Sequence, residues 1–318
     1  MVDVSIIIVN YNSFELLKNC LLTLYKYSKD FNYEVILIDN NSTEGDIEAL
    51  IKAFNKVILI KNDVNLGFSK ANNIGLKIAK GKYILFLNND IFFTENSVKK
   101  IFDLAETYNK KTFFGCKLLN IDGSWQPSSA KFPSGLNFFT SNFFLYLLFP
   151  SSPYFNKYYL QKKNINQPVE VNYILGAFLF GTRETLLRLQ GFDERFFFYA
   201  EDIDLCYRLK LMGGKTIFDP TTSVVHVGGA SVKSNQWFKF KNKAISELQF
   251  LQKHIKGLDF FVGVVSHYFG NIIRIPIFFV IGLFKFNKDL IKRSHFHLKL
   301  LFIYPKNLFK IISPKNIK

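Results

Sequence analysis

A group of carboxylates directly after an aromatic run is the part of the sequence best suited to chemistry. In FFFYAEDIDLCYR, residues 196–208, four aromatic residues lead into Glu201, Asp202 and Asp204. A carboxylate beside apolar walls, here the side chains of residues 197–199, has a raised pKa and can accept a proton from a hydroxyl. This stretch therefore predicts a general base.

Part of this group has a purely structural explanation. Acidic residues in the first turn of a helix complement the helix dipole. Asp204 also precedes Arg208 by four residues, which is the spacing of an ion pair along a helix. We assign this structural role to Asp204 and the role of general base to Asp202.

Polar residues follow four strand-like runs at the point where each run ends. Ligands of open α/β sheets bind at the carboxyl ends of the strands. Each polar residue alone is explained equally well as a turn residue or helix cap, but four groups at one sheet edge favour a polar crevice. The groups are Asn10, Tyr11 and Asn12; residues 39–42; Asn62, Asp63 and Asn65; and residues 88–90.

The group Asn88-Asn89-Asp90 presents oxygen atoms of the kind that bind Mg²⁺ or Mn²⁺. An ion held by so few protein groups completes its coordination with substrate phosphates. No GxGxxG follows the first strand-like run and no GxxxxGK[ST] is present, which argues against a dinucleotide cofactor and a P-loop. The phosphates must then be held another way, and the expected metal implies a diphosphate ligand.

Strand-like and helix-like segments alternate over residues 1–118, which predicts a Rossmann-like, mostly parallel sheet flanked by helices. The strand-like runs are almost continuously apolar, as expected for strands buried on both faces. The expected strands are Val4–Val9, Tyr33–Ile38, Lys56–Ile60, Tyr83–Leu87 and Thr112–Leu118, and the expected helices are Ser13–Tyr27, Thr43–Phe54, Ser69–Ala79 and Glu95–Tyr108.

Residues 119–234 lose this alternation and are predicted to complete an α/β catalytic domain of residues 1–234 as its acceptor-binding half. IDGSWQ and FPSG predict a hairpin and a loop. The other expected elements are an irregular insertion over residues 136–163, a strand in GAFLFGTR, helices at Glu184–Gln190 and Asp202–Met212, and a last strand at Val224–Val227.

Residues 235–318 form a basic and apolar tail that is predicted to be helical. Residues 231–318 contain 16 Lys and Arg against 3 Asp and Glu, whereas residues 1–230 contain 25 against 22. The apolar segment 258–284 is interrupted by His267, Arg274 and Pro276, so we favour a helix lying in the interface of an anionic bilayer over one that spans it. A helical pair docked on the catalytic domain is the alternative.

Cysteine usage and the N-terminus predict a cytosolic location. Cys20, Cys116 and Cys206 are scattered and lack the spacing of a metal site or disulfide framework. The opening MVDVSIIIVNYN lacks the basic start and cleavage site of a signal peptide.

Taken together, these motifs resemble glycosyltransferase family 2, whose members use nucleotide sugars and have the GT-A fold. The resemblance covers roughly residues 3–230 and is greatest to bacterial rhamnosyltransferase-type members that build cell-surface polysaccharide. It rests on the order and spacing of VSIIIVNYN, VILIDNNSTEGD, NLGFSKANNIGLKIAKGKYILFLNNDIFF, GAFLFGTRE, GFDERFFFYAEDIDLCYRLKLMGGK and VVHVGGAS.

The resemblance implies a nucleotide-sugar site. Asp39 matches the family carboxylate that accepts a hydrogen bond from the base, with Asn10 and Tyr11 lining the same pocket. Asn73 resembles a position facing the nucleotide or the sugar, although a capping or surface role explains it as well. The alternative for Asp39 is a helix cap.

The resemblance also implies a metal and a catalytic base. Asn88-Asn89-Asp90 matches the DxD motif, in which Asp90 alone keeps the carboxylate, so the site carries one charge fewer than usual. His226 matches a histidine that joins Asp90 on the metal, against the alternative of a buried core histidine. Glu201-Asp202 matches the ED motif, in which the Asp is the general base. Trp125 and Phe132 either wall the acceptor site or pack in the core.

The implied function is a metal-dependent inverting transfer of a sugar, rhamnose or another hexose, from a nucleotide-diphosphate donor to a saccharide or lipid-linked saccharide. Such an enzyme would work at the cytoplasmic face of the plasma membrane as a peripheral protein. A non-catalytic membrane-surface or saccharide-binding protein with the same fold is the alternative. A glycoside hydrolase is disfavoured because Glu201 and Asp202 are adjacent and poorly placed to flank a bond. Nucleic acid is not expected, because no nucleic-acid motif accompanies the basic tail.

Overall fold

A computed structural model describes residues 2–158, 160, 164–228 and 236–312, with side chains described as far as residue 303. The chain forms two compact units. The sheet unit comprises residues 1–132 and 163–233, and the helical unit comprises residues 133–162 and 234–318. The segment 133–162, expected within a domain of residues 1–234, therefore belongs with the C-terminal helices.

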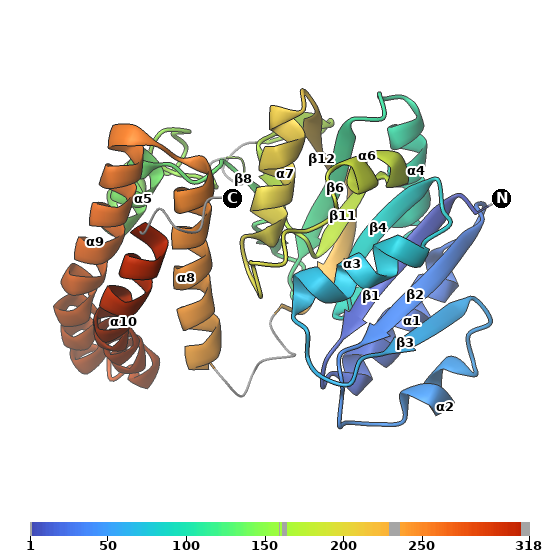
Figure 1. The fold of residues 1–318 in the computed structure, drawn as a ribbon, viewed down its shortest axis with the longest axis horizontal. Coiled ribbons are helices and arrows are strands. Elements are labelled where there is room, and N and C mark those ends of the chain that lie inside the picture. The colour runs from blue at the N-terminus through green and yellow to red at the C-terminus, as the bar shows by residue number, and fades with distance from the viewer. Residues whose placement is uncertain (1, 159, 161–163, 229–235, 313–318) are drawn as a thin grey trace. The chain divides into compact units, whose positions relative to one another are not determined.

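The sheet unit contains a mixed sheet in the order β3-β2-β1-β4-β11-β6-β12-β5 (Figure 1). The first four strands are parallel, β11 is antiparallel to both of its neighbours, and β12 is parallel to β6. The strands are β1 Val4–Asn10, β2 Tyr33–Asp39, β3 Val57–Lys61, β4 Tyr83–Asn88, β5 Ile91–Phe92, β6 Thr112–Leu119, β7 Trp125–Gln126, β8 Ser129–Ala130, β9 Val169–Val171, β10 Tyr173–Ile174, β11 Phe178–Thr182 and β12 Lys215–His226.

Helices cover both faces of this sheet, which explains the continuous apolar runs. On β1, Ile6 and Ile8 pack with the buried face of α1, whereas Ile7 points the other way, under Gly75 of α3. A β-carbon at Gly75 would lie 2.6 Å from Ile7, so glycine permits this close approach. The helices of this unit are α1 Phe14–Tyr27, α2 Ile47–Ile51, α3 Phe68–Ile78, α4 Ser97–Glu106, α6 Arg183–Arg188 and α7 Glu201–Leu211.

Two elements of the sheet unit differ from the sequence expectation. The helix expected over residues 43–54 is only α2. It begins at Ile47 because Asp46 caps it by accepting a hydrogen bond from the Ala49 amide at 2.9 Å. The strand expected at Val224–Val227 is instead the C-terminal part of β12. Its first half was missed because an irregularity between Asp219 and Ser223 breaks the apolar alternation.

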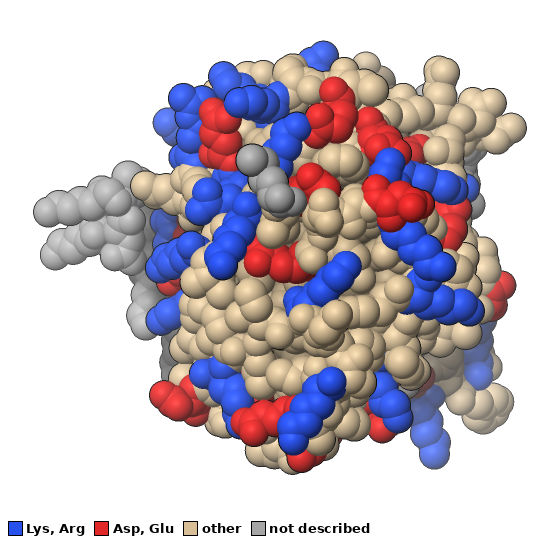
Figure 2. All heavy atoms as spheres, turned by 90° about the vertical axis from the view of Figure 1, so that its right-hand side faces the viewer, with Lys and Arg blue, Asp and Glu red and all other residues tan. Residues whose placement is uncertain are grey.

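Acidic and basic side chains are interspersed on the face of the molecule drawn in Figure 2. This agrees with the near balance of 25 Lys and Arg against 22 Asp and Glu in residues 1–230. The basic excess lies in the sequence of the helical unit.

The helical unit consists of α5 Gly135–Asn142, the short 3-10 helix Leu145–Leu147, α8 Gln236–His254, α9 Gly257–Phe284 and α10 Lys288–Ile312. The prediction of an irregular insertion over residues 136–163 is wrong at its start, because residues 135–142 form α5. Ser134 caps α5 by accepting from the Asn137 amide. A β-carbon at Gly270 would lie 2.4 Å from Asn142, so glycine permits a close approach of α5 and α9. Phe138 of α5 is buried in an apolar cluster against which Val264 and Tyr268 of α9 pack.

The apolar segment 258–284 lies in one continuous helix, α9, despite Pro276 inside it. Among the described residues, α9 alone is long and apolar enough to cross a membrane by length and composition. Such a criterion is also met by core helices of soluble proteins, so the orientation of the α9 side chains has to decide its role.

Candidate active site

The ends of three parallel strands bring together the residues predicted to hold the nucleotide. Asn10 is in register with Asp39 on β2, and the preceding residue of β1 pairs with Asn88 on β4. The Asn10 amide donates to Asp39 Oδ1 at 3.3 Å and to Ser42 Oγ at 3.0 Å, and Asn89 Nδ2 donates to Asn10 Oδ1 at 2.7 Å. These side chains form one hydrogen-bonded group at the sheet edge.

The two predicted contacts with the base differ in exposure. Asp39 is only 2% exposed, and its Oδ2 also accepts from the Ser42 amide at 3.2 Å. Tyr11 is 37% exposed and follows the buried Asn10 directly. Asp39 thus fixes the loop after β2, and Tyr11 offers an accessible ring beside it.

A second set of amides fixes the neighbouring loops. Asn62 Nδ2 donates to Asn40 Oδ1 at 2.8 Å, and Asn40 Nδ2 donates to Asn65 Oδ1 and to the Gly67 carbonyl, both at 3.3 Å. These bonds connect the ends of β2 and β3 to the start of α3. The polar residues after β3 therefore act as a scaffold for the site.

The predicted metal ligands face one another across two strands. β12 pairs antiparallel with β5, so that His226 lies opposite Ile91, the residue after Asp90. His226 Nε2 lies 3.3 Å from Asp90 Oδ1, and Asn88 Nδ2 lies 3.4 Å from the same ring nitrogen. Asp90 Oδ2 accepts from the Gly228 amide at 3.1 Å. Gly229 and Ser231 of the same motif lie outside the described residues.

Gln126 determines which nitrogen of His226 carries the proton. Its Nε2 donates to Asn120 Oδ1 at 3.0 Å and to the His226 carbonyl at 3.4 Å, which leaves Oε1 to face His226 Nδ1 at 2.5 Å. Because Gln126 Oε1 can only accept, Nδ1 must donate. In the neutral ring, Nε2 therefore presents a lone pair towards Asp90.

This geometry fits a divalent cation. Asp90 Oδ1 is buried and has no hydrogen-bond donor among the described residues. An oxygen and a nitrogen lone pair that face each other cannot bond directly, but a cation between them would satisfy both. Adjacent ligands of an octahedral ion with bonds of about 2.1 Å are about 3 Å apart, close to the 3.3 Å found here. Asp90 and His226 are therefore suitable ligands, completed by non-protein groups.

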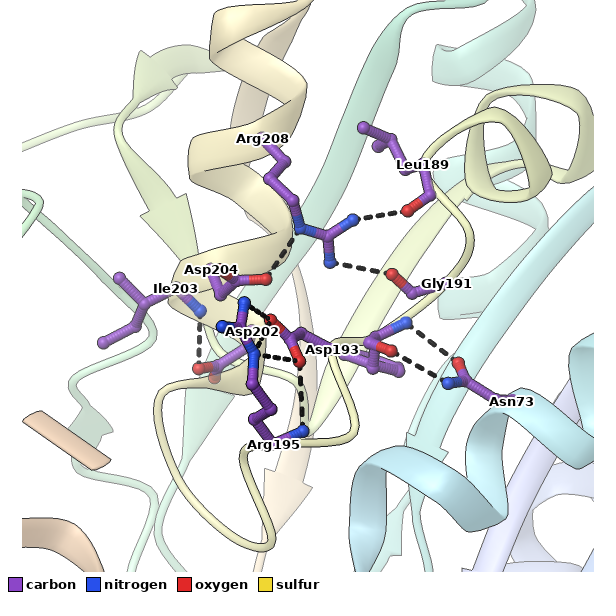
Figure 3. Close-up of polar contacts among 10 residues, drawn as sticks. Asn73, Leu189, Gly191, Asp193, Arg195, Asp202, Ile203, Asp204 and Arg208 are labelled. Atoms are coloured by element: carbon purple, nitrogen blue, oxygen red, sulfur yellow. Dashed lines mark hydrogen bonds and ion pairs between the residues drawn. The ribbon is translucent and has the colours of Figure 1, made fainter. Parts of the chain in front are cut away.

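The predicted catalytic pair, Glu201 and Asp202, lies at the first turn of α7, and Figure 3 shows Asp202 there. Tyr199 and Ala200 precede it with φ angles of 72° and 64°, a conformation that non-glycine residues rarely adopt. Asp202 Oδ2 accepts from the Gly176 amide at 2.8 Å and Oδ1 accepts from the Ile203 amide at 2.8 Å. The aromatic run and the strained turn thus present Asp202 on a defined backbone.

Burial changes the proton affinity of both acids. It raises the pKa of Asp202, while the hydrogen bonds from Gly176 and Ile203 act in the opposite direction. Burial, together with the charge of Asp202, raises the pKa of Glu201 well above its ordinary value. Glu201 is 6% exposed, and its Oε2 has no partner among the described residues. Two adjacent acids of raised pKa are typical of catalytic sites.

The loop before α7 is held from two sides. Asp204 Oδ2 pairs with Arg208 Nε at 2.7 Å, and the guanidinium donates to the Leu189 and Gly191 carbonyls at 2.5 and 2.8 Å (Figure 3). The expected pairing of Asp204 with Arg208 is confirmed. Asn73 on α3 binds the loop from its other side through both backbone groups of residue 192, each at 2.8 Å.

Asn73 also donates to Glu194 Oε1 at 3.2 Å, so its amide is fully used in holding this loop. The residues of the aromatic run differ in exposure: Phe196 is buried, whereas Phe197 is 41% exposed and lies over Gly67. Ser69 Oγ donates to the Phe196 carbonyl at 2.6 Å. α3 therefore positions the segment that leads into Asp202.

The three predicted carboxylates lie at one edge of the sheet. Asp39 is linked through Asn10 to Asn89, which precedes Asp90 in the chain. The Asn88 amide donates to the Ala177 carbonyl at 3.0 Å, and the adjacent Gly176 donates to Asp202. A short chain of hydrogen bonds thus connects the nucleotide, metal and base positions.

Sequence reasoning missed the roles of Gln126 and Gly176. Gln126 lies in IDGSWQ, which was interpreted only as a hairpin, and nothing local indicates that it meets His226. Trp125 stacks on Phe218 with ring centroids 5.9 Å apart, and Phe132 meets Tyr207 edge-on at 4.9 Å. Both of these aromatic residues make packing contacts within the sheet unit.

The model of the family described as Glycosyl transferase family 2 matches residues 5–174. The chain belongs to glycosyltransferase family 2. It is 27% identical over 209 residues to the N-acetylglucosaminyl-diphospho-decaprenol L-rhamnosyltransferase of Mycobacterium tuberculosis, a match that covers 60% of this chain and 66% of that protein. It is 29% identical over 233 residues to rhamnosyltransferase WbbL of Escherichia coli K12, covering 70% and 83% of the two chains.

Solved structures share the fold of this family 2 chain. The mannosyltransferase PcManGT from Pyrobaculum calidifontis, crystallised with GDP-Man and Mn²⁺, has a TM-score of 0.58 at 16% identity and covers 96% of this chain and 87% of its own. GalNAc-T7, crystallised with UDP, GalNAc and Mn²⁺, also has a TM-score of 0.58, at 17% identity, covering 79% and 48% of the two chains. The GT-A fold implied by the sequence motifs is confirmed.

Proposed function

We propose that this protein is a metal-dependent, inverting glycosyltransferase that moves a sugar from a nucleotide-diphosphate donor to a saccharide or lipid-linked saccharide in cell-surface polysaccharide synthesis. The observation that carries the proposal is the position of Asp90 Oδ1 and His226 Nε2, which face each other at 3.3 Å on the same sheet edge as Asp202. This edge would therefore place the donor diphosphate and the general base, Asp202, within one site.

The donor would bind at the ends of β1, β2 and β4. Asp39, fixed by Asn10 and Ser42, offers a carboxylate for the base, and the exposed ring of Tyr11 offers a stacking surface. Asp90 and His226 would hold Mg²⁺ or Mn²⁺, with Asn88 and Asn89 nearby. When bound, such an ion would neutralise the charge of the departing nucleotide diphosphate.

Asp202 would remove the proton from the attacking hydroxyl. Burial raises the pKa of Asp202 in the direction of neutral pH, and a carboxylate with a pKa nearer the working pH is a more effective general base. The bonds from Gly176 and Ile203 hold the carboxyl in one orientation. Glu201, buried beside it, would remain protonated to higher pH and leave the negative charge on Asp202. One direct displacement of this kind inverts the anomeric configuration.

The names of the relatives suggest a donor and an acceptor. Two of them are rhamnosyltransferases, and a third, 34% identical over 116 residues, is a β-1,3-glucosyltransferase from Escherichia coli named for UDP-Glc and a diphosphoundecaprenol acceptor. We infer a rhamnose or hexose donor and a polyprenyl-diphosphate saccharide acceptor. Such an acceptor lies in the membrane, so the enzyme would act at the cytoplasmic face of the plasma membrane as a peripheral protein.

Thermal unfolding with a panel of nucleotide sugars tests this function. UDP-, dTDP- and GDP-sugars are compared with and without Mn²⁺ or Mg²⁺, and one nucleotide class is expected to raise the Tm in a metal-dependent manner. The variant Asp90→Asn should lose the metal-dependent part of that shift. Failure of every nucleotide would reject the catalytic proposal in favour of the non-catalytic saccharide-binding or membrane-surface alternative.

A further inference from the structure

The helix α9 buries polar side chains and exposes apolar ones, which is the opposite of the usual arrangement in a soluble protein. Soluble helices bury an apolar stripe and expose polar residues. The fully buried residues of α9 are instead small or polar: Gly263, Ser266, His267, Gly270, Asn271 and Gly282. Phe260, Val264 and Tyr268 are partly buried beside them, against the apolar cluster of the helical unit. Large apolar residues recur every few positions on the outside of the helix. The exposed ones are Leu258, Phe261, Phe269, Ile272, Phe279, Val280, Ile281, Leu283 and Phe284.

The polar groups of α9 are satisfied inside the helical unit. His267 Nε2 lies 3.5 Å from Glu247 Oε2 on α8. Asn271 Nδ2 donates to the His267 carbonyl at 2.6 Å, and Asn271 Oδ1 lies 2.5 Å from His297 Nδ1 on α10. This network faces inwards, so it does not oppose contact between the outer face and an apolar medium.

Arg274, the charge that argued against an apolar role for this segment, also points inwards. Its guanidinium donates to the Ser141 carbonyl at 2.7 Å and to Asn142 Oδ1, both in or beside α5. Pro276 lies on the outer side, where it helps to line a shallow apolar depression with Ile277, Val280 and Ile281. The interruptions seen in the sequence therefore leave the outer face apolar.

The turn between α9 and α10 extends this apolar surface and adds positive charge. Phe284 is 81% exposed and Phe286 is 94% exposed. Lys285 and Lys288 flank them and are exposed, as are Lys292, Arg293 and Lys299 along α10. Asp259 and Asp289 are the acids of residues 256–303, and Asp259 accepts from the Gly135 amide at 2.9 Å.

An anionic bilayer matches this combination. An exposed apolar surface of this extent marks a binding site, and the flanking Lys and Arg residues select a negatively charged partner. A protein partner would need carboxylates around an apolar groove, whereas a bilayer of anionic lipids presents both features together. A lipid surface also leaves the inward polar network of α9 undisturbed.

We propose that the outer face of α9 and the turn 284–288, here called the docking face, seat the helical unit on an anionic bilayer with α9 lying in the interface. A spanning arrangement is disfavoured because α10 packs along α9 (Figure 1) and would carry Lys292, Arg293 and Lys299 into the hydrocarbon with it. This inference rests on the proposed function in that it names the surface by which the enzyme would contact the membrane. It can be tested without measuring sugar transfer.

Flotation of the full chain with vesicles tests the docking face. Vesicles of phosphatidylcholine alone are compared with vesicles that also contain phosphatidylglycerol, and the protein is expected to float with the anionic ones. The double variant Phe284→Ser/Phe286→Ser should reduce partitioning about tenfold or more, because two aromatic side chains no longer enter the interface. Ile121→Ser, at a 74% exposed position of the sheet unit, is the matched control and should float like the parent chain.

The charge contribution is tested in the same assay. Lys285→Glu/Lys288→Glu should clearly weaken the preference for anionic vesicles, whereas Lys29→Glu in the sheet unit should leave it unchanged. Three results would overturn the proposal: equal flotation of the Phe284/Phe286 variant and the parent chain, resistance of the bound protein to alkaline carbonate, which would indicate spanning, or a solution dimer that this variant dissociates. A nucleotide-dependent Tm shift that persists without vesicle binding would leave the catalytic proposal intact.

Discussion

Removal of the Gln126 side-chain amide should weaken metal binding without removing a metal ligand. In Gln126→Leu, His226 Nδ1 loses the acceptor that lies 2.5 Å away, and the ring becomes free to turn or to carry its proton on Nε2. Loss of one hydrogen bond to a buried group costs about 1–3 kcal/mol, and loss of such an outer partner of a metal-binding histidine lowers affinity roughly 10- to 100-fold. We expect a loss of Mn²⁺ affinity in that range.

Calorimetric titration of Mn²⁺ in the presence of the nucleoside diphosphate measures this affinity directly. The apparent KM for Mn²⁺ should rise in parallel, with a smaller change in kcat at saturating metal. Gln126→Glu keeps an acceptor for Nδ1 and should retain more affinity than the leucine variant. Asn120→Ala removes a different partner of Gln126, the acceptor of its Nε2 3.0 Å away, and controls for a general loosening of the hairpin. Unchanged Mn²⁺ affinity in Gln126→Leu would refute the assigned tautomer and the metal site built on it.

Three further predictions concern α7. Asp202→Asn should lower kcat by about 10²- to 10⁴-fold while the Kd for the donor nucleotide changes little; retained turnover would exclude Asp202 as the base. Arg208→Met should lower the free energy of unfolding by about 3–5 kcal/mol, since the fully buried Asp204 would lose its ion pair with Arg208. Denaturant unfolding measures this loss, and Asp204→Leu/Arg208→Met should recover part of it if the buried carboxylate is responsible. Folding raises the pKa of Glu201, so its contribution to stability is full below the unfolded-state pKa of about 4.3 and is lost as the pH rises towards the folded-state pKa. The Tm of Glu201→Gln should therefore rise relative to that of the parent chain with increasing pH. Parallel Tm curves over roughly pH 4 to 9 would contradict this.

Most elements of the sheet unit were predictable from local patterns. Continuous apolar runs such as Val4–Asn10 and Tyr33–Asp39 require a sheet that is covered on both faces, and the polar residues after them then have to meet at one edge. The pairing of Asp204 with Arg208 follows from helical spacing alone. These features depend on interactions that are close in sequence or repeated along it.

Other features were not predictable because their signal lies in distant parts of the chain. α5 was missed because the partners of Phe138 and Asn142, which include Val264 and Gly270 of α9, come from a distant part of the chain. Gln126 is 100 residues away from the histidine that it orients. For Asn73 the sequence left open a position facing the nucleotide or the sugar and a capping or surface role, and only the folded chain shows its amide bound to the backbone of Phe192.

The sequence by itself determined the family, the GT-A sheet and the residue types at its edge, since parallel strands and their polar ends follow from composition and period. The tertiary structure decided what those residues do to one another: that His226 turns its Nε2 to Asp90, that α3 and Arg208 hold the loop before Asp202, and that α9 directs its polar residues inwards. The physical reason is that hydrogen-bond direction, burial and proton affinity depend on neighbours in space, and those neighbours come from strands and helices far apart in the chain.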